Sequence, residues 1–247
     1  MRDTRIIMGM PITVEVIDAI STETMARVFD LFESVDARFS TYRADSEIMR
    51  FNRREITEAH FSDDMKEVFA LAHATADESE GFFDVKRADG LIDPSGIVKG
   101  WAIKKAAELL TGEGCRNFLV DAGGDIQARG KNEDGEDWRV GIRSPFQMSE
   151  IIKVVAPRGA GMATSGSYVR GAHVWNPHVP MDTLSDILSI TVIGPDVLEA
   201  DRFATAAFAM GADGIYFIEG LPGFEAYQVN ARGLATQTSN FQDYVIS

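Results

Sequence analysis

The chain has 247 residues, of which 45% are hydrophobic and 25% are charged, the composition of an ordinary soluble globular protein. Its formal net charge of −14 disfavours nucleic-acid binding, because no run of Lys and Arg offsets the repulsion from phosphates. Cys115 is the only cysteine, which excludes an intramolecular disulfide.

The sequence also contains no recognisable sorting signal. The N-terminal residues form no apolar signal core, and no stretch reaches the roughly 18 apolar residues of a membrane span. We therefore expect a cytoplasmic protein without a membrane anchor. No low-complexity segment or linker divides the chain, so residues 1–247 are expected to form a single domain.

Hydrophobic periodicity predicts a mixture of helices and strands. In chain order these are a strand at 12–17, a helix at 21–35 capped by Ser21, a helix at 62–76, a loop through Asp93-Pro94-Ser95-Gly96, a helix at about 100–110, strands at 118–121, 138–142, 151–156 and 189–193, a helix at about 200–210 ended by Gly211, and strands at 215–218 and 226–229. Short turns between neighbouring strands indicate antiparallel pairing. The predicted fold class is therefore α+β, with helices packed on antiparallel sheets.

Two polar residues share one face of the last long predicted helix. Asp201 and Thr205 are four residues apart, among apolar neighbours. A carboxylate and a hydroxyl in this arrangement suit a hard cation such as Mg²⁺. The alternative interpretation is structural: Asp201 stands in the first turn and favours the helix dipole, while Thr205 bonds back to the preceding turn.

The segment Ser95-Gly96-Ile97-Val98-Lys99-Gly100 lies directly before a predicted helix. Backbone N–H groups at the start of a helix, together with the Lys99 ammonium group, would bind phosphate, although the spacing is not that of a P-loop. The alternative is a glycine-rich turn with a solvated lysine.

Three further segments each allow a functional and a structural interpretation. Gly123-Gly124-Asp125 follows an apolar strand and permits either close approach of a ligand or a hairpin turn. Thr164-Ser165-Gly166 offers donors to phosphate or forms a turn. His173 either acts as a base near neutral pH or is a packed residue of the core.

The order of such segments along the chain is more specific than any one of them. The series comprises Met8-Gly9-Met10, Phe39-Ser40-Thr41-Tyr42, Ser46-Glu47-Ile48, Phe83-Asp84-Val85, residues 95–102, 123–126, 163–166, 173–177 and 201–206. This series resembles the ApbE family, the FAD:protein FMN transferases, over nearly the whole chain.

The resemblance implies an architecture related to the tunnelling fold, with FAD bound in a cleft and Mg²⁺ at its pyrophosphate. It implies that the metal is held by the Val98 carbonyl, Asp201 and Thr205, and that His173 and Asp201 are catalytic. The implied flavin- and nucleotide-binding residues are Met8, Tyr42, Lys99, Gly123, Gly124, Asp125, Thr164, Ser165, Gly166 and His173. The implied reaction is attack by a Thr or Ser hydroxyl of an acceptor protein on the FMN-side phosphorus of FAD, with release of AMP.

The chain departs from the family after His173. The family usually has Asp-Pro-Arg-Thr-Gly there, and this chain has Asn176-Pro177-His178-Val179-Pro180. Two alternatives therefore stay open: Mg²⁺-dependent hydrolysis of FAD to FMN and AMP, and non-catalytic FAD binding. Ala235-Thr236-Gln237-Thr238 lacks the aspartate of a family acceptor site, so we expect the acceptor to be a separate protein.

Overall fold

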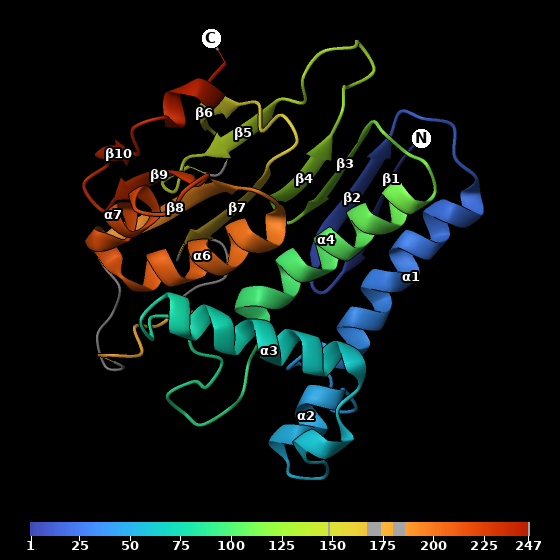
Figure 1. The fold of residues 1–247 in the computed structure, drawn as a ribbon, viewed down its shortest axis with the longest axis vertical. Helices are drawn as coiled ribbons and strands as arrows, with labels where there is room; N and C mark the ends of the chain where they lie inside the picture. Colours follow the sequence, from blue (N-terminus) through green and yellow to red (C-terminus); the bar gives the residue numbers. More distant parts are fainter. Residues whose placement is uncertain (148, 167–173, 180–185, 247) are drawn as a thin grey trace.

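A computed structural model describes residues 1–147, 149–166, 174–179 and 186–246 (Figure 1). In this part of the chain, eight strands form one sheet in the order β1-β2-β3-β4-β7-β8-β9-β10, and β5 and β6 form a separate pair. Every pairing is antiparallel, which confirms the predicted α+β class. The strands are β1 Arg2–Ile7, β2 Met10–Val16, β3 Phe118–Ala122, β4 Asp125–Arg129, β5 Val140–Arg143, β6 Ile151–Val155, β7 Gly161–Gly166, β8 Ile187–Gly194, β9 Glu225–Asn230 and β10 Ala235–Gln237.

The long helices gather on one face of this sheet (Figure 1). The helices are α1 Thr22–Phe39, α2 Glu47–Asn52, α3 Asp63–Glu78, α4 Ser95–Gly112, α6 Val197–Ala209 and α7 Gly214–Glu219, with 3₁₀ turns η1 Glu58–His60, η2 Gly211–Asp213 and η3 Phe241–Tyr244. Helix α4 packs on β3 and β4, while α6 packs on β7 and β8. Helix α3 contacts both α4 and α6. Among the described residues, none of the helices has the length and apolar character needed to span a membrane.

The sheet is covered differently along its width. In β2, Ile12, Val14 and Val16 are buried under the helices, while the residues between them are more exposed. In β8, Ile190 and Val192 pack under α6, whereas Ile193 joins a second cluster on the opposite face with residues of β5 and β6. Strand β8 is therefore buried along almost its whole length, as expected for a strand that is covered on both faces.

Most predicted elements are present, with shifted ends. Ser21 caps α1 as predicted, accepting the Thr24 N–H at 3.0 Å. Gly211 follows α6 with a φ of +65°, the left-handed conformation that ends many helices. The elements β1, α2, β4, β7 and β10 were not predicted from the sequence, and the starts of α4 and α6 were predicted too late.

The predicted strand at 215–218 is wrong, because these residues belong to helix α7. A short apolar run fits either a buried strand or a buried helix. Here Ile215 and Ile218, three residues apart, are 4% and 0% exposed, while Tyr216 is 72% exposed. Gly214 allows α7 to pack against α6, because a Cβ on Gly214 would lie 2.0 Å from the Ala207 carbonyl oxygen. This contact is not readable from local sequence.

Candidate functional site

Helices α4 and α6 approach closely because two glycines of α4 face two polar residues of α6. A Cβ on Gly100 would lie 2.7 Å from the Asp201 Cβ, and a Cβ on Gly96 would lie 3.0 Å from the Thr205 Cγ2. The two glycines are four residues apart in α4, and Asp201 and Thr205 are four residues apart in α6. The two contacts therefore lie one helical turn apart along both helices. The close packing of the helices therefore depends on the absence of a side chain at Gly100, while a methyl group at Gly96 would crowd the side chains of Thr205 and Phe83.

Asp201 and Thr205 also bond to α4. Asp201 Oδ2 accepts the Gly100 N–H at 2.7 Å, and the Thr205 hydroxyl donates to the Gly96 carbonyl at 3.2 Å. Asp201 is 3% exposed and lies in the second turn of α6, because Asp196 is the N-cap. The structural alternative is thus wrong in both parts: Asp201 is not in the first turn, and Thr205 contacts another helix rather than its own preceding turn.

The segment from Ser95 to Gly100 is part of α4 and is not a loop before it, which corrects the sequence prediction. Lys99 is not a solvated lysine either: its side chain is 13% exposed, and its Nζ lies 2.5 Å from Asp125 Oδ2. Asp125 Oδ1 in turn accepts the Thr164 N–H at 3.0 Å. One buried ion pair therefore links α4 to β4 and β7.

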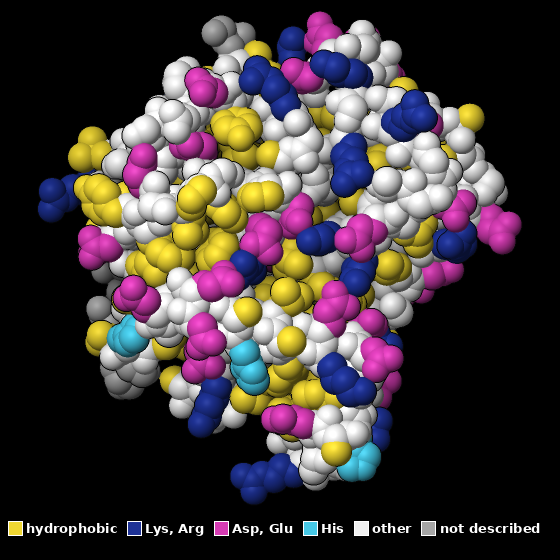
Figure 2. Space-filling model, in the orientation of Figure 1, with side chains coloured by type: hydrophobic (Ala, Val, Ile, Leu, Met, Phe, Trp, Pro, Cys, Tyr) yellow, Lys and Arg dark blue, Asp and Glu magenta, His cyan; other side chains and the backbone are white. Residues whose placement is uncertain are grey.

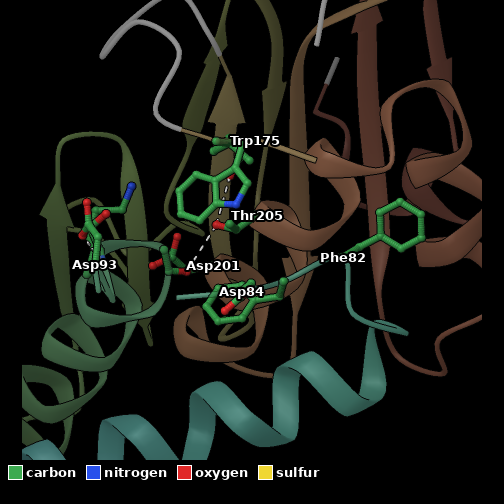
Figure 3. A pocket seen from close by; sticks show the side chains of 12 residues that line it. Phe82, Asp84, Asp93, Trp175, Asp201 and Thr205 are labelled. Atoms are coloured by element: carbon green, nitrogen blue, oxygen red, sulfur yellow. Dashed lines mark hydrogen bonds between the residues drawn. The ribbon is translucent and has the colours of Figure 1, made fainter. Parts of the chain in front are cut away.

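A pocket opens beside this helix contact (Figure 3). Its lining residues are Phe82, Phe83, Asp84, Asp93, Ser95, Gly96, Lys99, Ser165, Val174, Trp175, Asp201 and Thr205. We call this hollow the α4–α6 pocket. It brings together Lys99, Ser165, Asp201 and Thr205, which come from three separate segments singled out in the sequence.

Several residues of the α4–α6 pocket had no role predicted from the sequence. In Figure 3, Trp175 lies beside Thr205, and Asp84 lies near Asp201. Asp84 and Trp175 stand inside segments of the family series, so their positions carried a signal. Phe82 and Asp93 carried none: they reach the pocket because the chain between α3 and α4 lies against it.

Other predicted residues lie outside the pocket lining. Among the described residues, Met8 stands in the β1–β2 turn with a φ of +55°, and Tyr42 is 97% exposed. Gly123 and Gly124 form the two-residue turn between β3 and β4, with φ of +63° and +101°, so the hairpin interpretation is correct for them. Their proposed contact with flavin stays a prediction.

The remaining predicted residues have mixed outcomes. Thr164, Ser165 and Gly166 form the end of β7, so the turn interpretation is wrong for them. Val98 is 2% exposed within α4, and the carbonyl in contact with Thr205 is that of Gly96. The metal-binding role of the Val98 carbonyl stays a prediction. His173 lies outside the described residues.

The atoms around Thr205 fit a hard cation. The Gly96 carbonyl and the Ser165 hydroxyl contact the Thr205 hydroxyl, with 3.5 Å between Ser165 Oγ and Thr205 Oγ1, and the Asp201 carboxylate lines the same pocket. Oxygen ligands with few carboxylates are what Mg²⁺ prefers, since substrate phosphates and water supply the rest. The described part of the chain contains no group of three or more His, Cys, Asp or Glu side chains placed to hold a metal ion.

The charge of the α4–α6 pocket comes from its own lining. Over the face shown in Figure 2, acidic and basic side chains are interspersed. Among the residues that the structure describes, the pocket lining holds three carboxylates, from Asp84, Asp93 and Asp201, and one cation, Lys99, which is paired with Asp125. A bare pyrophosphate would be repelled by this lining, whereas a pyrophosphate that carries a divalent cation would not.

The environment of Asp121, near the end of β3, leads us to expect that the free energy of unfolding depends on pH. Burial raises the pKa of its carboxyl above the ordinary 3.8, although the Gly124 N–H bonded to it has the opposite effect. Because the folded-state pKa is the higher one, ionised Asp121 destabilises the fold. This penalty begins to fall as pH drops through the folded-state pKa and is gone below the unfolded-state pKa. Asp121→Asn keeps an acceptor for Gly124 and should raise the urea midpoint at neutral pH, with a gain that shrinks in acid. An equal gain at both pH values would contradict this assignment.

The fold and the site together define an α+β protein with an oxygen-lined pocket between α4, α6 and β7. The family model described as the ApbE family matches residues 8–88 and 86–228, and the chain therefore belongs to the ApbE family. The FAD:protein FMN transferase of Vibrio cholerae is 26% identical over 274 residues, covering 88% of this chain and 80% of the relative. The Haemophilus influenzae protein of the same name is 28% identical over 260 residues, covering 80% and 75%.

Solved structures agree on the architecture. Flavin transferase ApbE from Vibrio cholerae superposes with a TM-score of 0.86 at 24% identity, covering 99% of this chain and 98% of that one. The apo form of the Pseudomonas stutzeri flavinyl transferase ApbE gives a TM-score of 0.82 at 23% identity, covering 100% and 97%. At these identities the likeness shows the fold, and it confirms the ApbE-like architecture expected from the sequence.

Proposed function

We propose that this chain is an FAD:protein FMN transferase that requires Mg²⁺ and releases AMP. The observation that carries the proposal is the contact of Asp201 and Thr205 with the glycines of α4, which concentrates oxygen ligands in the α4–α6 pocket. Family membership and the names of the relatives support the same reaction.

In this proposal different residues of the pocket bind the metal ion, the pyrophosphate and the rings of FAD. Asp201 and Thr205, with a carbonyl of Val98 or Gly96, hold Mg²⁺, which when bound would neutralise charge on the pyrophosphate and the departing phosphate. Lys99 adds a positive charge near the pyrophosphate, and its ion pair with Asp125 fixes the orientation of the lysine side chain. Trp175 and Phe82 offer flat apolar surfaces to the rings of FAD.

The chemical step requires a hydroxyl and a base. The Thr or Ser hydroxyl of the acceptor protein attacks the FMN-side phosphorus and forms a new P–O bond. The bond from this phosphorus to the bridging oxygen of the pyrophosphate breaks, and AMP leaves with that oxygen. His173 takes the hydroxyl proton in this scheme, as predicted from the sequence. We take the acceptor to be a separate protein, because the stretch Ala235-Thr236-Gln237-Thr238 lacks the acceptor aspartate. In addition, Thr238 is 2% exposed and its hydroxyl contacts Glu225, which disfavours its modification in place.

One experiment tests the proposal against hydrolysis and simple binding. The chain is incubated with FAD and Mg²⁺, with and without an acceptor protein that carries a family flavinylation sequence, and then with EDTA in excess. We expect AMP release and a fluorescent flavin band on a denaturing gel, both dependent on acceptor and both lost with EDTA. AMP without a band would indicate hydrolysis instead. Bound FAD without AMP in any sample would overturn both enzymatic proposals.

A further inference from the structure

The segment 174–179 is attached to the loop that follows α3. The His178 Nε2–H donates to the Glu80 carbonyl at 3.0 Å, and the His178 ring lies against the Phe82 ring with 4.4 Å between centroids. A Cβ on Gly81 would lie 3.5 Å from the same imidazole. His178 thus rests on three consecutive residues of this loop.

The contact between His178 and Phe82 joins two segments that both line the α4–α6 pocket. Phe82 lines the pocket itself, and Trp175, three residues before His178, lines it from the other segment (Figure 3). The chain between Trp175 and His178 is folded as a turn, because Asn176 accepts the N–H groups of His178 at 2.9 Å and Val179 at 3.1 Å. Because this turn is short and hydrogen-bonded, fixing His178 restricts where Trp175 can lie.

The loop that receives His178 is itself firmly held. Gly81 has a φ of +81°, which a residue with a side chain rarely adopts, and its N–H donates to the Ala76 carbonyl at 2.8 Å at the end of α3. The fully buried Ser79 accepts the Phe83 N–H at 3.0 Å. This loop is therefore a fixed platform, and a side chain that binds it becomes fixed as well.

We propose that His178 is a positioning residue that fastens the Trp175 segment to the Phe82 loop. It thereby fixes the positions of Phe82 and Trp175, which together we call the aromatic wall of the α4–α6 pocket. The inference rests on the proposed function for its effect on FAD, since the pocket is taken as the FAD site. His178 does not line the pocket and takes no part in the reaction. Its role is to hold Trp175 at a fixed distance from Asp201 and Thr205.

The test uses the intrinsic fluorescence of Trp175. Trp101 and Trp138 are 3% and 8% exposed, so acrylamide quenching reports chiefly on Trp175, and Trp175→Phe provides the background to subtract. His178→Ala should raise the Trp175 quenching constant and weaken FAD binding about 5- to 10-fold, the equivalent of one hydrogen bond and one ring contact. The kcat at saturating FAD should stay within about 2-fold, because the reacting groups are untouched.

Two further variants separate positioning from general damage. His178→Gln retains an N–H donor for the Glu80 carbonyl and should restore part of the lost FAD affinity. His73→Ala removes an exposed histidine of α3 and should match the wild type in quenching and in affinity. Should His178→Ala fold poorly, His178→Gln carries the same test, with a smaller increase in quenching.

The outcomes distinguish this inference from the proposed function. Wild-type quenching and FAD affinity in His178→Ala would overturn the positioning role. A fall in kcat at unchanged FAD affinity would overturn it too, since that result would give His178 a part in the reaction. Absence of FAD binding by the wild type would defeat the proposed function, whereas the quenching comparison needs no FAD and still decides whether His178 holds Trp175.

Discussion

Asp201→Asn is expected to reduce FMN transfer at least about 100-fold, because it removes the only charge among the proposed metal ligands. The substitution is nearly isosteric. The amide oxygen of Asn can still accept the Gly100 N–H that Asp201 Oδ2 accepts at 2.7 Å, so the contact between α4 and α6 is retained. Initial rates at saturating FAD, measured over a Mg²⁺ titration, give the size of the effect. The apparent Mg²⁺ requirement should shift to higher concentration.

The matched control for this variant is Asp196→Asn on the same helix. Asp196 caps α6 by accepting the Glu199 N–H at 3.1 Å, and Asn is an equally good cap. Its partly exposed ion pair with Lys104 contributes little to stability. Asp196→Asn should therefore transfer FMN at close to the wild-type rate. Transfer by Asp201→Asn at the wild-type rate, with an unchanged Mg²⁺ requirement, would remove Asp201 from the metal site.

The pairing of Asp201 with Thr205 was predictable because it follows from helix geometry alone. A spacing of four residues places two side chains on one face wherever the helix packs. The partner of that face was not predictable from spacing, since Gly96 and Gly100 are about a hundred residues away along the chain. The resemblance to the ApbE family implied that the segment 95–100 and the pair Asp201–Thr205 belong to one site. The structure shows that these two segments are in contact.

The glycine-lysine segment was predicted wrongly for a physical reason. Glycine is unfavourable in a helix by about 1 kcal/mol, so two glycines ahead of an apolar stripe indicate a loop. Here α4 continues through Gly96 and Gly100, and the close approach of α6 leaves no room for a side chain at Gly100 and little room at Gly96. Tertiary packing outweighs local propensity, and the same effect explains why Lys99 is buried beside Asp125 rather than solvated.

The aromatic wall shows a different limit of sequence reasoning. Phe82 and His178 belong to segments that are distant in sequence, and neither has a spacing that indicates chemistry. At the level of the sequence, the departure from the family pattern after His173 bears only on the reaction, because it keeps hydrolysis of FAD and non-catalytic FAD binding open as alternatives. The positioning role proposed for His178 rests on its contact with Glu80 and Phe82, which is a property of the folded chain.

Gly100→Ala is expected to destabilise the fold by about 1–3 kcal/mol and to abolish most of the transfer activity. The added methyl would lie 2.7 Å from the Asp201 Cβ and 2.8 Å from the Val197 carbonyl oxygen, and a backbone atom cannot swing aside as a side chain can. The helices α4 and α6 must therefore separate, which displaces Asp201 from Gly100 and alters the pocket. Urea unfolding measures the stability, and initial rates measure the transfer.

Gly112→Ala is the matched change at the other end of the same helix. A Cβ there meets nothing within 4 Å, so the substitution should be neutral or stabilise the protein by up to about 1 kcal/mol through helix propensity. The two variants add the same methyl group to α4, and only one adds it against α6. A Gly100→Ala protein as stable as Gly112→Ala would mean that the helices do not depend on this close approach. The two glycines on either side of Lys99 would then require an explanation other than helix packing.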